Sequence, residues 1–142
     1  MFLEDDLLDI VVFYRKKGRH YICYGSDDFE KSKITPEEKE KFEKLSIKAK
    51  PLTFGLYNDM QESALVPDNL GNKKWNYKVY KENKLISIIS QWDAKIKDVE
   101  GKMVTAPINR NTIAKMSPDV AETILNIYDK LTLIEDDEEK KS

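Results

Sequence analysis

This chain has little of what catalytic and metal sites are built from. It contains one cysteine and one histidine, and its five glycines are scattered rather than grouped in a loop that could hold phosphate. As the single cysteine, Cys23 cannot form an internal disulfide, and the apolar, aromatic run around it favours a packed thiol over a reactive one. His20 is an odd number of residues away, so the two side chains would face opposite sides of a strand. The sequence predicts no enzyme, no metal site and no cofactor.

The chain also lacks an excess of charge of either sign. Its 24 basic and 26 acidic residues leave a net charge of -2, which gives no overall field to attract nucleic acid or an anionic membrane. Residues 1–6 carry acids where a signal peptide needs positive charge, and no apolar run reaches membrane-spanning length. We therefore expect a cytoplasmic protein whose partner is another protein, with self-association left open.

Charged side chains are nevertheless abundant, at 35% of the residues against 40% hydrophobic. That composition predicts a modest core under a strongly solvated surface. A chain of this length suits one domain. We expect that domain to span residues 1–134 and a charged, flexible tail to occupy 135–142.

Two runs of β-branched and aromatic residues, 10–14 and 20–24, flank a basic segment. This pattern predicts a β-hairpin over residues 9–25, in which Gly18 supplies the positive φ of the turn. The basic segment 15–19 lies between two tyrosines, an arrangement that can hold single-stranded nucleic acid. A solvated hairpin tip is the simpler interpretation, so no nucleic acid partner is expected. Residues 27–30 lack the glycine and final glutamate of a calcium loop and are interpreted as a polar linker.

The segment after this linker begins with a helix-start signal. Thr35 can act as the N-cap, proline follows at the first helical position, and Glu38 can complete a capping box. The sequence therefore predicts a helix over residues 36–49. Its apolar stripe would consist of residues three and four apart, namely Phe42, Leu45 and Ala49.

Two further helices are predicted in the middle of the chain. Thr53 can cap a helix over residues 53–65. A more apolar helix over residues 74–92 is expected to form the centre of the core, although the β-branched Ile86, Ile88 and Ile89 leave a strand as the alternative. The apolar face of this second helix consists of Leu85, Ile88, Ile89 and Trp92.

The last third of the chain contains a turn and two capped helices. Glu100-Gly101 predicts a turn between two short extended pieces. Asp93 and Asp98 could form a carboxylate pair for acid and base chemistry, but nothing apolar encloses them, so a role in stabilising the turn is preferred. Asn111 is expected to cap a helix over 112–116, and a second helix is predicted over 118–132.

These signals together predict an α+β fold that is mostly helical. An N-terminal hairpin would pack on a small bundle of about four to five helices. The positions expected to define the fold are Thr35, Trp92, Asp98, Gly101, Asn111 and Pro118.

The order of motifs over residues 52–134 resembles that of the tail assembly chaperones of long-tailed bacteriophages. The shared pattern has a leucine-threonine-phenylalanine helix start, a helix ending in tryptophan, an acidic turn with glycine, and an extended piece with proline. An asparagine-x-isoleucine phrase then leads to a small residue, a proline and a final helix. These elements are here Leu52-Thr53-Phe54, Ile89 to Trp92, Asp98 to Gly101, Val104 to Ile108, Asn111 to Pro118, and Val120 to Leu125. The hairpin at 10–24 lies outside the resemblance.

The resemblance implies a non-enzymatic chaperone that coats the tape-measure protein until tail-tube subunits displace it. Members often exist in a short form and a longer frameshifted form. Lys140-Lys141 would be compatible with an adenine-rich slippery codon pair, which reading the gene would test. The mechanism implied is reversible binding of a long helical client by exposed apolar side chains. The candidate surface consists of Phe54, Tyr57, Met60, Leu65, Tyr77 and Tyr80.

Two alternatives remain open at this point. The chain could be a structural virion protein of the tail or neck, with its hairpin added to a neighbour's sheet. It could also be a small regulatory or inhibitory protein that acts through protein binding. For each residue of the candidate surface, burial in an ordinary core is an equally good interpretation.

Overall fold

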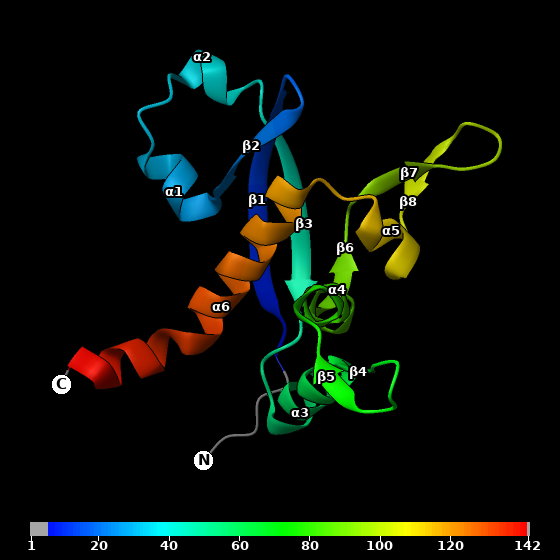
Figure 1. Cartoon of the computed structure of the whole chain (residues 1–142). Coiled ribbons are helices and arrows are strands. Elements are labelled where there is room, and N and C mark those ends of the chain that lie inside the picture. Colours follow the sequence, from blue (N-terminus) through cyan, green and yellow to red (C-terminus); the bar gives the residue numbers. More distant parts are fainter. Residues whose placement is uncertain (1–5, 142) are drawn as a thin grey trace.

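The centre of the molecule is an antiparallel sheet of four strands, so the predicted helical bundle is wrong. The computed structural model describes the backbone over residues 6–141 and side chains over residues 6–132. In the sheet the strands follow the order β2, β1, β3, β6 (Figure 1). Their bounds are β1 (Leu8–Lys17), β2 (His20–Gly25), β3 (Glu43–Ala49) and β6 (Ile89–Trp92).

The predicted N-terminal hairpin is confirmed. β1 and β2 pair antiparallel from Val12 opposite Gly25 to Lys17 opposite His20. Gly18 adopts a φ of 65° in the turn, as expected for the residue that reverses the chain. The hairpin supplies two of the four strands of the sheet, with β2 at one edge.

The helix predicted over residues 36–49 is wrong beyond its first turn. Only α2 (Pro36–Lys39) forms, and Thr35 caps it by accepting a hydrogen bond from the Glu38 N–H at 3.2 Å. The Glu38 carboxylate bonds to the Arg15 and Lys41 side chains. The following residues become β3, because Leu45, Ile47 and Ala49 also alternate with the period of a strand and pair with β1. Pairing with a distant strand therefore overrides the local helical spacing.

The predicted linker at 27–30 is also wrong, because it forms part of helix α1 (Ser26–Lys31). Its Phe29 is buried and stacks on a phenylalanine of β1, with ring centroids 4.2 Å apart. Two more rings lie within about 6 Å of Phe29 and fasten α1 and the segment after α2 to the sheet. We call this group the inner aromatic cluster: Phe13, Tyr24, Phe29 and Phe42.

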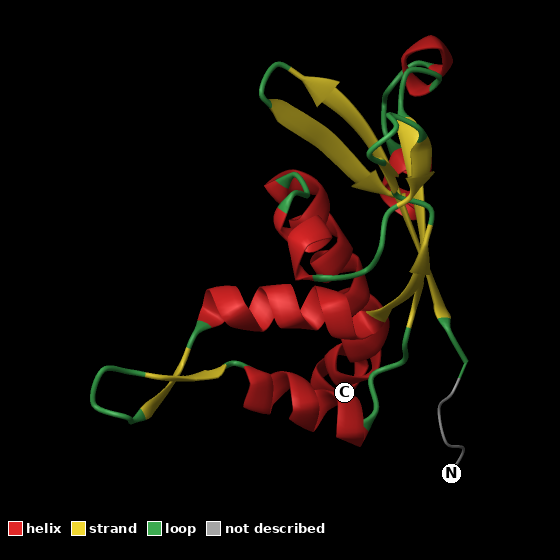
Figure 2. Cartoon of the chain, turned by 90° about the vertical axis from the view of Figure 1, so that its right-hand side faces the viewer, coloured by secondary structure: helices red, strands yellow, loops and turns green. Residues whose placement is uncertain are grey.

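Helices α3 (Phe54–Ser63) and α4 (Tyr77–Ile88) lie side by side below the sheet, joined by the hairpin of β4 (Leu65–Pro67) and β5 (Lys73–Trp75). Figure 2 shows this hairpin projecting beyond the joined ends of the two helices. Thr53 caps α3 as predicted, by accepting a hydrogen bond from the Leu56 N–H.

The helix predicted over residues 74–92 is corrected at both ends. Asn76 caps α4, so the helix begins at Tyr77. Its end at Ile88 is followed by β6, because Trp92 pairs with Ile47 of β3 and donates its indole N–H to the Ala106 carbonyl oxygen at 2.7 Å. Of the residues for which a strand was the alternative, only Ile89 belongs to one.

The turn predicted at Glu100-Gly101 is confirmed. It joins β7 (Lys95–Lys97) to β8 (Met103–Thr105), and Gly101 has a φ of 81°. Asp98 stabilises the turn by accepting hydrogen bonds from the N–H groups of Glu100 and Lys102, both at 2.9 Å.

The two C-terminal helices differ from their predicted bounds. The helix predicted over 112–116 is α5 (Arg110–Ala114), and its cap is Asn109 rather than Asn111, which lies inside the helix. Asn109 caps better because its side chain bonds the Thr112 N–H while Thr112 bonds back. The last helix, α6 (Pro118–Lys141), starts at Pro118 as predicted and continues past residue 132. The side chains of 133–142 lie outside the described residues, so the flexible tail stays a prediction.

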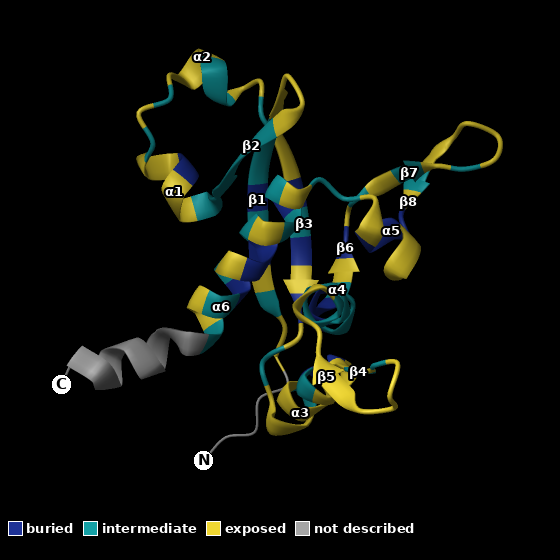
Figure 3. Cartoon of the chain, in the orientation of Figure 1, coloured by how far each residue is buried: buried dark blue, intermediate teal, exposed yellow. Residues whose placement is uncertain are grey.

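The core lies between one face of the sheet and helices α4 and α6 (Figure 3). Ile10 and Val12 of β1 face Ile124 and Tyr128 of α6, and all four are fully buried. The Tyr128 hydroxyl donates a hydrogen bond at 3.0 Å to the Lys50 carbonyl oxygen just after β3. This bond ties α6 to the end of the sheet from which α3 continues.

Candidate functional site

The six residues of the predicted binding surface do not share one environment. Phe54 and Tyr77 are 83% and 61% exposed, Tyr57 and Leu65 are also exposed, and Tyr80 is half-buried. Met60 is wrong as a surface residue, because it faces the core at 1% exposure. Met60 lies three residues after Tyr57, on the side of α3 that faces the core. Its spacing along the helix therefore indicates packing in the core rather than binding.

The structure brings Leu65, Tyr77 and Tyr80 together and adds Trp75. Leu65 lies opposite Trp75 in the β4–β5 hairpin, so their side chains share one face. The Trp75 and Tyr80 rings are 4.8 Å apart, and the Tyr77 and Tyr80 rings are 6.3 Å apart. We call these four residues the aromatic patch. Trp75 and Leu65 are both more than two-fifths exposed, so the patch is open to solvent.

Two lysines of α4 lie over the two tyrosine rings of the aromatic patch. The Lys81 ammonium lies 4.6 Å from the Tyr77 ring and bonds to Glu122 of α6 at 2.6 Å, and this hydrogen bond raises the pKa of Lys81. The Lys84 ammonium lies 5.5 Å from the Tyr80 ring and bonds to Asp129 of α6 at 2.6 Å. Both cations that lie over the tyrosine rings are therefore paired with carboxylates of α6.

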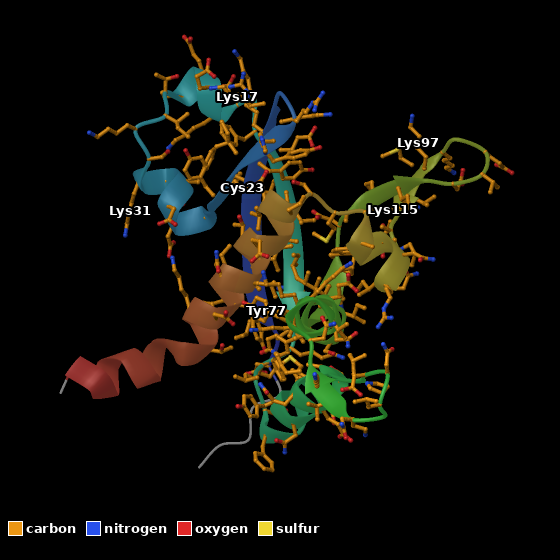
Figure 4. The ribbon with its side chains drawn as sticks, viewed as in Figure 1. Lys17, Cys23, Lys31, Tyr77, Lys97 and Lys115 are labelled. Carbon is orange, nitrogen blue, oxygen red and sulfur yellow. The ribbon has the colours of Figure 1, made fainter. Side chains whose placement is uncertain are left out.

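The helix predicted over residues 74–92 contains Trp75 in its first turn, so Trp75 was not included in the predicted binding surface. The signal that would have found it is Asn76, a good N-cap between two aromatic residues. Such a cap places Trp75 before the helix and Tyr77 within it, which lets their rings gather at the helix start. Figure 4 shows Tyr77 near the end of α4 that faces the viewer.

A second feature is a cleft of about 660 Å³ between the sheet, β7 and β8, and the loop from α5 to α6. Its floor is formed by the buried residues Leu45, Trp92 and Val120. Flexible Met103 and Met116 line its sides, and methionine adapts readily to the shape of a bound group. The strands β7 and β8 and the loop from α5 to α6, which line the cleft, lie at the end of the sheet away from α3, β4 and β5 (Figure 1).

The acidic residues of the cleft are engaged within the fold. Burial and a hydrogen bond with Glu43 raise the pKa of Tyr14 to about 12. Asp93 accepts a hydrogen bond from the Ser46 N–H at 2.8 Å and lies apart from the turn that Asp98 stabilises, so the two carboxylates serve different loops. Three exposed lysines at the cleft have no carboxylate partner among residues 6–132: Lys44, Lys95 and Lys115.

The residues first considered for chemistry do not assemble into a reactive site. His20 lies 3.9 Å from Asp119, and burial raises the pKa of the Cys23 thiol, which disfavours the thiolate. Arg15 of the basic segment bonds to Glu38, while Tyr14 and Tyr21 line the cleft. Within the described part of the chain, no group of three or more histidine, cysteine, aspartate or glutamate residues is placed to hold a metal ion.

Across residues 6–141, no helix combines the length and apolar character needed to cross a bilayer. No protein-family model matches this chain, and neither do the curated proteins or the solved structures.

Proposed function

We propose that this chain is a non-enzymatic tail assembly chaperone of a long-tailed phage. Acting in the cytoplasm of the infected bacterium, it binds the tape-measure protein through the aromatic patch. The observation that carries the proposal is the exposed, ordered set of Leu65, Trp75, Tyr77 and Tyr80. The order of sequence motifs over residues 52–134 supplies the identity of the client.

The chemistry of the patch suits a helical client. Trp and Tyr rings present large apolar faces with polar tips, so the patch stays hydrated when free and loses little conformational freedom when bound. The cations at Lys81 and Lys84 already restrict the tyrosine rings, which lowers the ordering cost of binding. A client helix with apolar residues three and four apart would cover the patch with one stripe.

The test is co-expression of the chain with the tape-measure protein of the same phage. Trp75→Ser combined with Tyr77→Ser should weaken binding at least about tenfold, because aromatic residues at the centre of an interface commonly contribute 2 kcal/mol or more. The measurements are the soluble fraction of the tape-measure protein and the affinity of the purified pair.

Val99→Ser is the matched control. Val99 is fully exposed at the tip of the β7–β8 turn and touches neither the aromatic patch nor the floor of the cleft. It removes an exposed apolar side chain and should leave binding unchanged. Equal losses from Val99→Ser and from the patch variant would show that general surface apolarity, rather than the patch, holds the client.

A structural virion protein is the second candidate, and the edge position of β2 favours it. An edge strand can accept a neighbour's strand. However, the outward N–H of Tyr21 already donates to Asp119 at 3.0 Å, which occupies part of that edge. Mass spectrometry of purified particles separates the two functions, because a chaperone is absent from mature particles and a structural protein is present.

A further inference from the structure

The cleft carries positively charged side chains that take no part in the proposed function of the aromatic patch. Its carboxylates bond within the fold, whereas Lys44, Lys95 and Lys115 surround an apolar floor without an acidic partner among residues 6–132. Lys95 bonds only to the neutral Thr105 hydroxyl, at 3.0 Å. Such a cleft fits an acidic peptide segment that also carries apolar side chains.

The chain itself contains a segment with this chemistry. Residues 135–139 are five consecutive acids, and Leu133-Ile134 come directly before them. The segment belongs to α6, whose backbone is helical from Pro118 to Lys141. Residue 135 lies 17 positions after Pro118, which corresponds to about 26 Å along the helix axis.

The cleft and the acidic segment lie at opposite ends of the same helix. Ser117 and Val120, at the start of α6, line the cleft, whereas the acids follow at its far end. A helix that continues from Pro118 to Lys141 keeps its two ends apart. The acidic segment of one copy is therefore placed to meet the cleft of another copy rather than its own.

We infer that this chain self-associates head to tail, with residues 133–139 of one copy bound in the lysine-rimmed cleft of a second copy. Such a contact joins two different surfaces and leaves a free cleft and a free acidic segment at the two ends of each assembly. Copies therefore add on as a row or close into a ring. The inference is independent of the proposed client, because it uses none of the residues of the aromatic patch.

Two variants, each lacking one half of the contact, provide the test. In the cleft variant Lys44→Glu, Lys95→Glu and Lys115→Glu reverse the charge. In the tail variant Glu135→Gln, Asp136→Asn, Asp137→Asn, Glu138→Gln and Glu139→Gln remove it. Light scattering after gel filtration at low salt measures the mass of the native chain, of each variant and of their equimolar mixture.

The native chain should exceed its monomer mass of 16.6 kDa increasingly with concentration. High salt should reverse this, since the Debye length falls to about 3 Å at 1 M salt. Each variant alone should remain monomeric. Their mixture should form a dimer and nothing larger, because the cleft variant donates its acidic segment to the intact cleft of the tail variant and no further partner fits.

The control variant Lys31→Glu, Lys33→Glu, Lys78→Glu changes three other exposed lysines by the same charge and should associate as the native chain does. Figure 4 shows Lys31 and Lys115 on opposite sides of the sheet. If the cleft variant fails to fold by circular dichroism, Lys44→Gln, Lys95→Gln, Lys115→Gln replaces it.

A native chain that stays monomeric at every concentration overturns the inference, and so does association by either variant alone. A mixture that remains monomeric also overturns it. None of these results affects the proposed chaperone function, which is tested separately by the aromatic-patch variant, its Val99→Ser control and the protein content of purified particles. The two proposals can therefore be rejected separately.

Discussion

The inner aromatic cluster and the aromatic patch are built from the same kinds of residue but have opposite exposure. In the inner cluster Phe29 is buried and stacks at 4.2 Å, and the rings fasten α1 and the segment after α2 to the sheet. In the patch Trp75 and Tyr77 face solvent, where Trp75 packs on Tyr80 and a lysine of α4 lies over the Tyr77 ring. The comparison suggests that ring contacts alone do not separate folding from binding. What separates them is whether a second element of the chain covers the rings.

The largest expected effect is on the free energy of unfolding, and it tests whether covered rings stabilise the fold more than exposed ones. Phe29→Ala should lower the free energy of unfolding by about 3 kcal/mol, because it empties the centre of the inner cluster. Phe54→Ala, at an exposed position on α3, should change it by no more than about 0.5 kcal/mol. Urea unfolding measures both. Similar losses for the two variants would break the comparison.

The next effect concerns the base of the aromatic patch. Asp129→Ala leaves the nearly buried Lys84 ammonium without its carboxylate and should cost about 1–3 kcal/mol of unfolding free energy. Lys84→Met keeps the apolar part of the side chain and leaves only Asp129 without its partner. Because Asp129 is already partly solvated, this variant should lose less than about 1 kcal/mol of unfolding free energy. Thermal and urea unfolding provide the measurement. A larger loss for Lys84→Met would mean that the cation–ring contacts, rather than desolvation, dominate.

Removing the Tyr128 hydroxyl should have a smaller effect on stability at neutral pH and a characteristic pH dependence at alkaline pH. Tyr128→Phe removes the hydrogen bond to the Lys50 carbonyl and should cost about 1 kcal/mol at pH 7. Burial raises the pKa of Tyr128 from 10.0 to about 12, so the folded state retains the proton more strongly than the unfolded state. The stability from this shift is present below pH 10 and is lost as the pH rises toward 12.

Urea unfolding across that alkaline window should show a shallower loss in Tyr128→Phe than in the native chain. Part of the loss should remain, because the pKa of Tyr14 is also raised to about 12. An unchanged slope would show that Tyr128 ionises as freely in the folded state as in the unfolded state. The core around Tyr128 would then be more accessible to solvent than the inner aromatic cluster.

The smallest effect compares two glycines. Gly55 lies in the first turn of α3 with open space around the position of a Cβ, so Gly55→Ala should stabilise the fold by about 0.5 kcal/mol. Gly101→Ala should destabilise it by about 1 kcal/mol because Gly101 has a φ of 81°. Differential scanning calorimetry can resolve the opposite signs. A stabilised Gly55→Ala variant that still binds the client would show that the helix beside the patch can be tightened without loss of function.

Local chemistry determined which parts of the fold were predictable. The caps at Thr35 and Thr53 and the turn at Asp98 and Gly101 depend on neighbours within four residues, and the sequence identifies them. β3 could not be predicted in this way, because Leu45 and Ala49 fit both a helix and a strand. The choice was made by β1, more than thirty residues earlier.

The same distinction applies to the candidate sites. Tyr77 and Tyr80 could be named from residue type, whereas Met60 was misplaced because spacing does not show which helix face meets a neighbour. The cleft combines residues from eight elements and the loops between them, and no single segment indicates it. Asp98 stabilises the β7–β8 turn as predicted, whereas Asp93 lines the cleft and accepts a hydrogen bond from the N–H of Ser46, 47 residues earlier in the chain.

The position of α6 has a consequence for synthesis on the ribosome. Ile10 and Val12 are made more than a hundred residues before Ile124 and Tyr128, the side chains of α6 that cover them. The growing chain therefore carries an uncovered apolar sheet face until α6 has been made, a state prone to aggregation. A product released before residue 117 would retain that exposed face permanently and should depend on cellular chaperones to remain in solution.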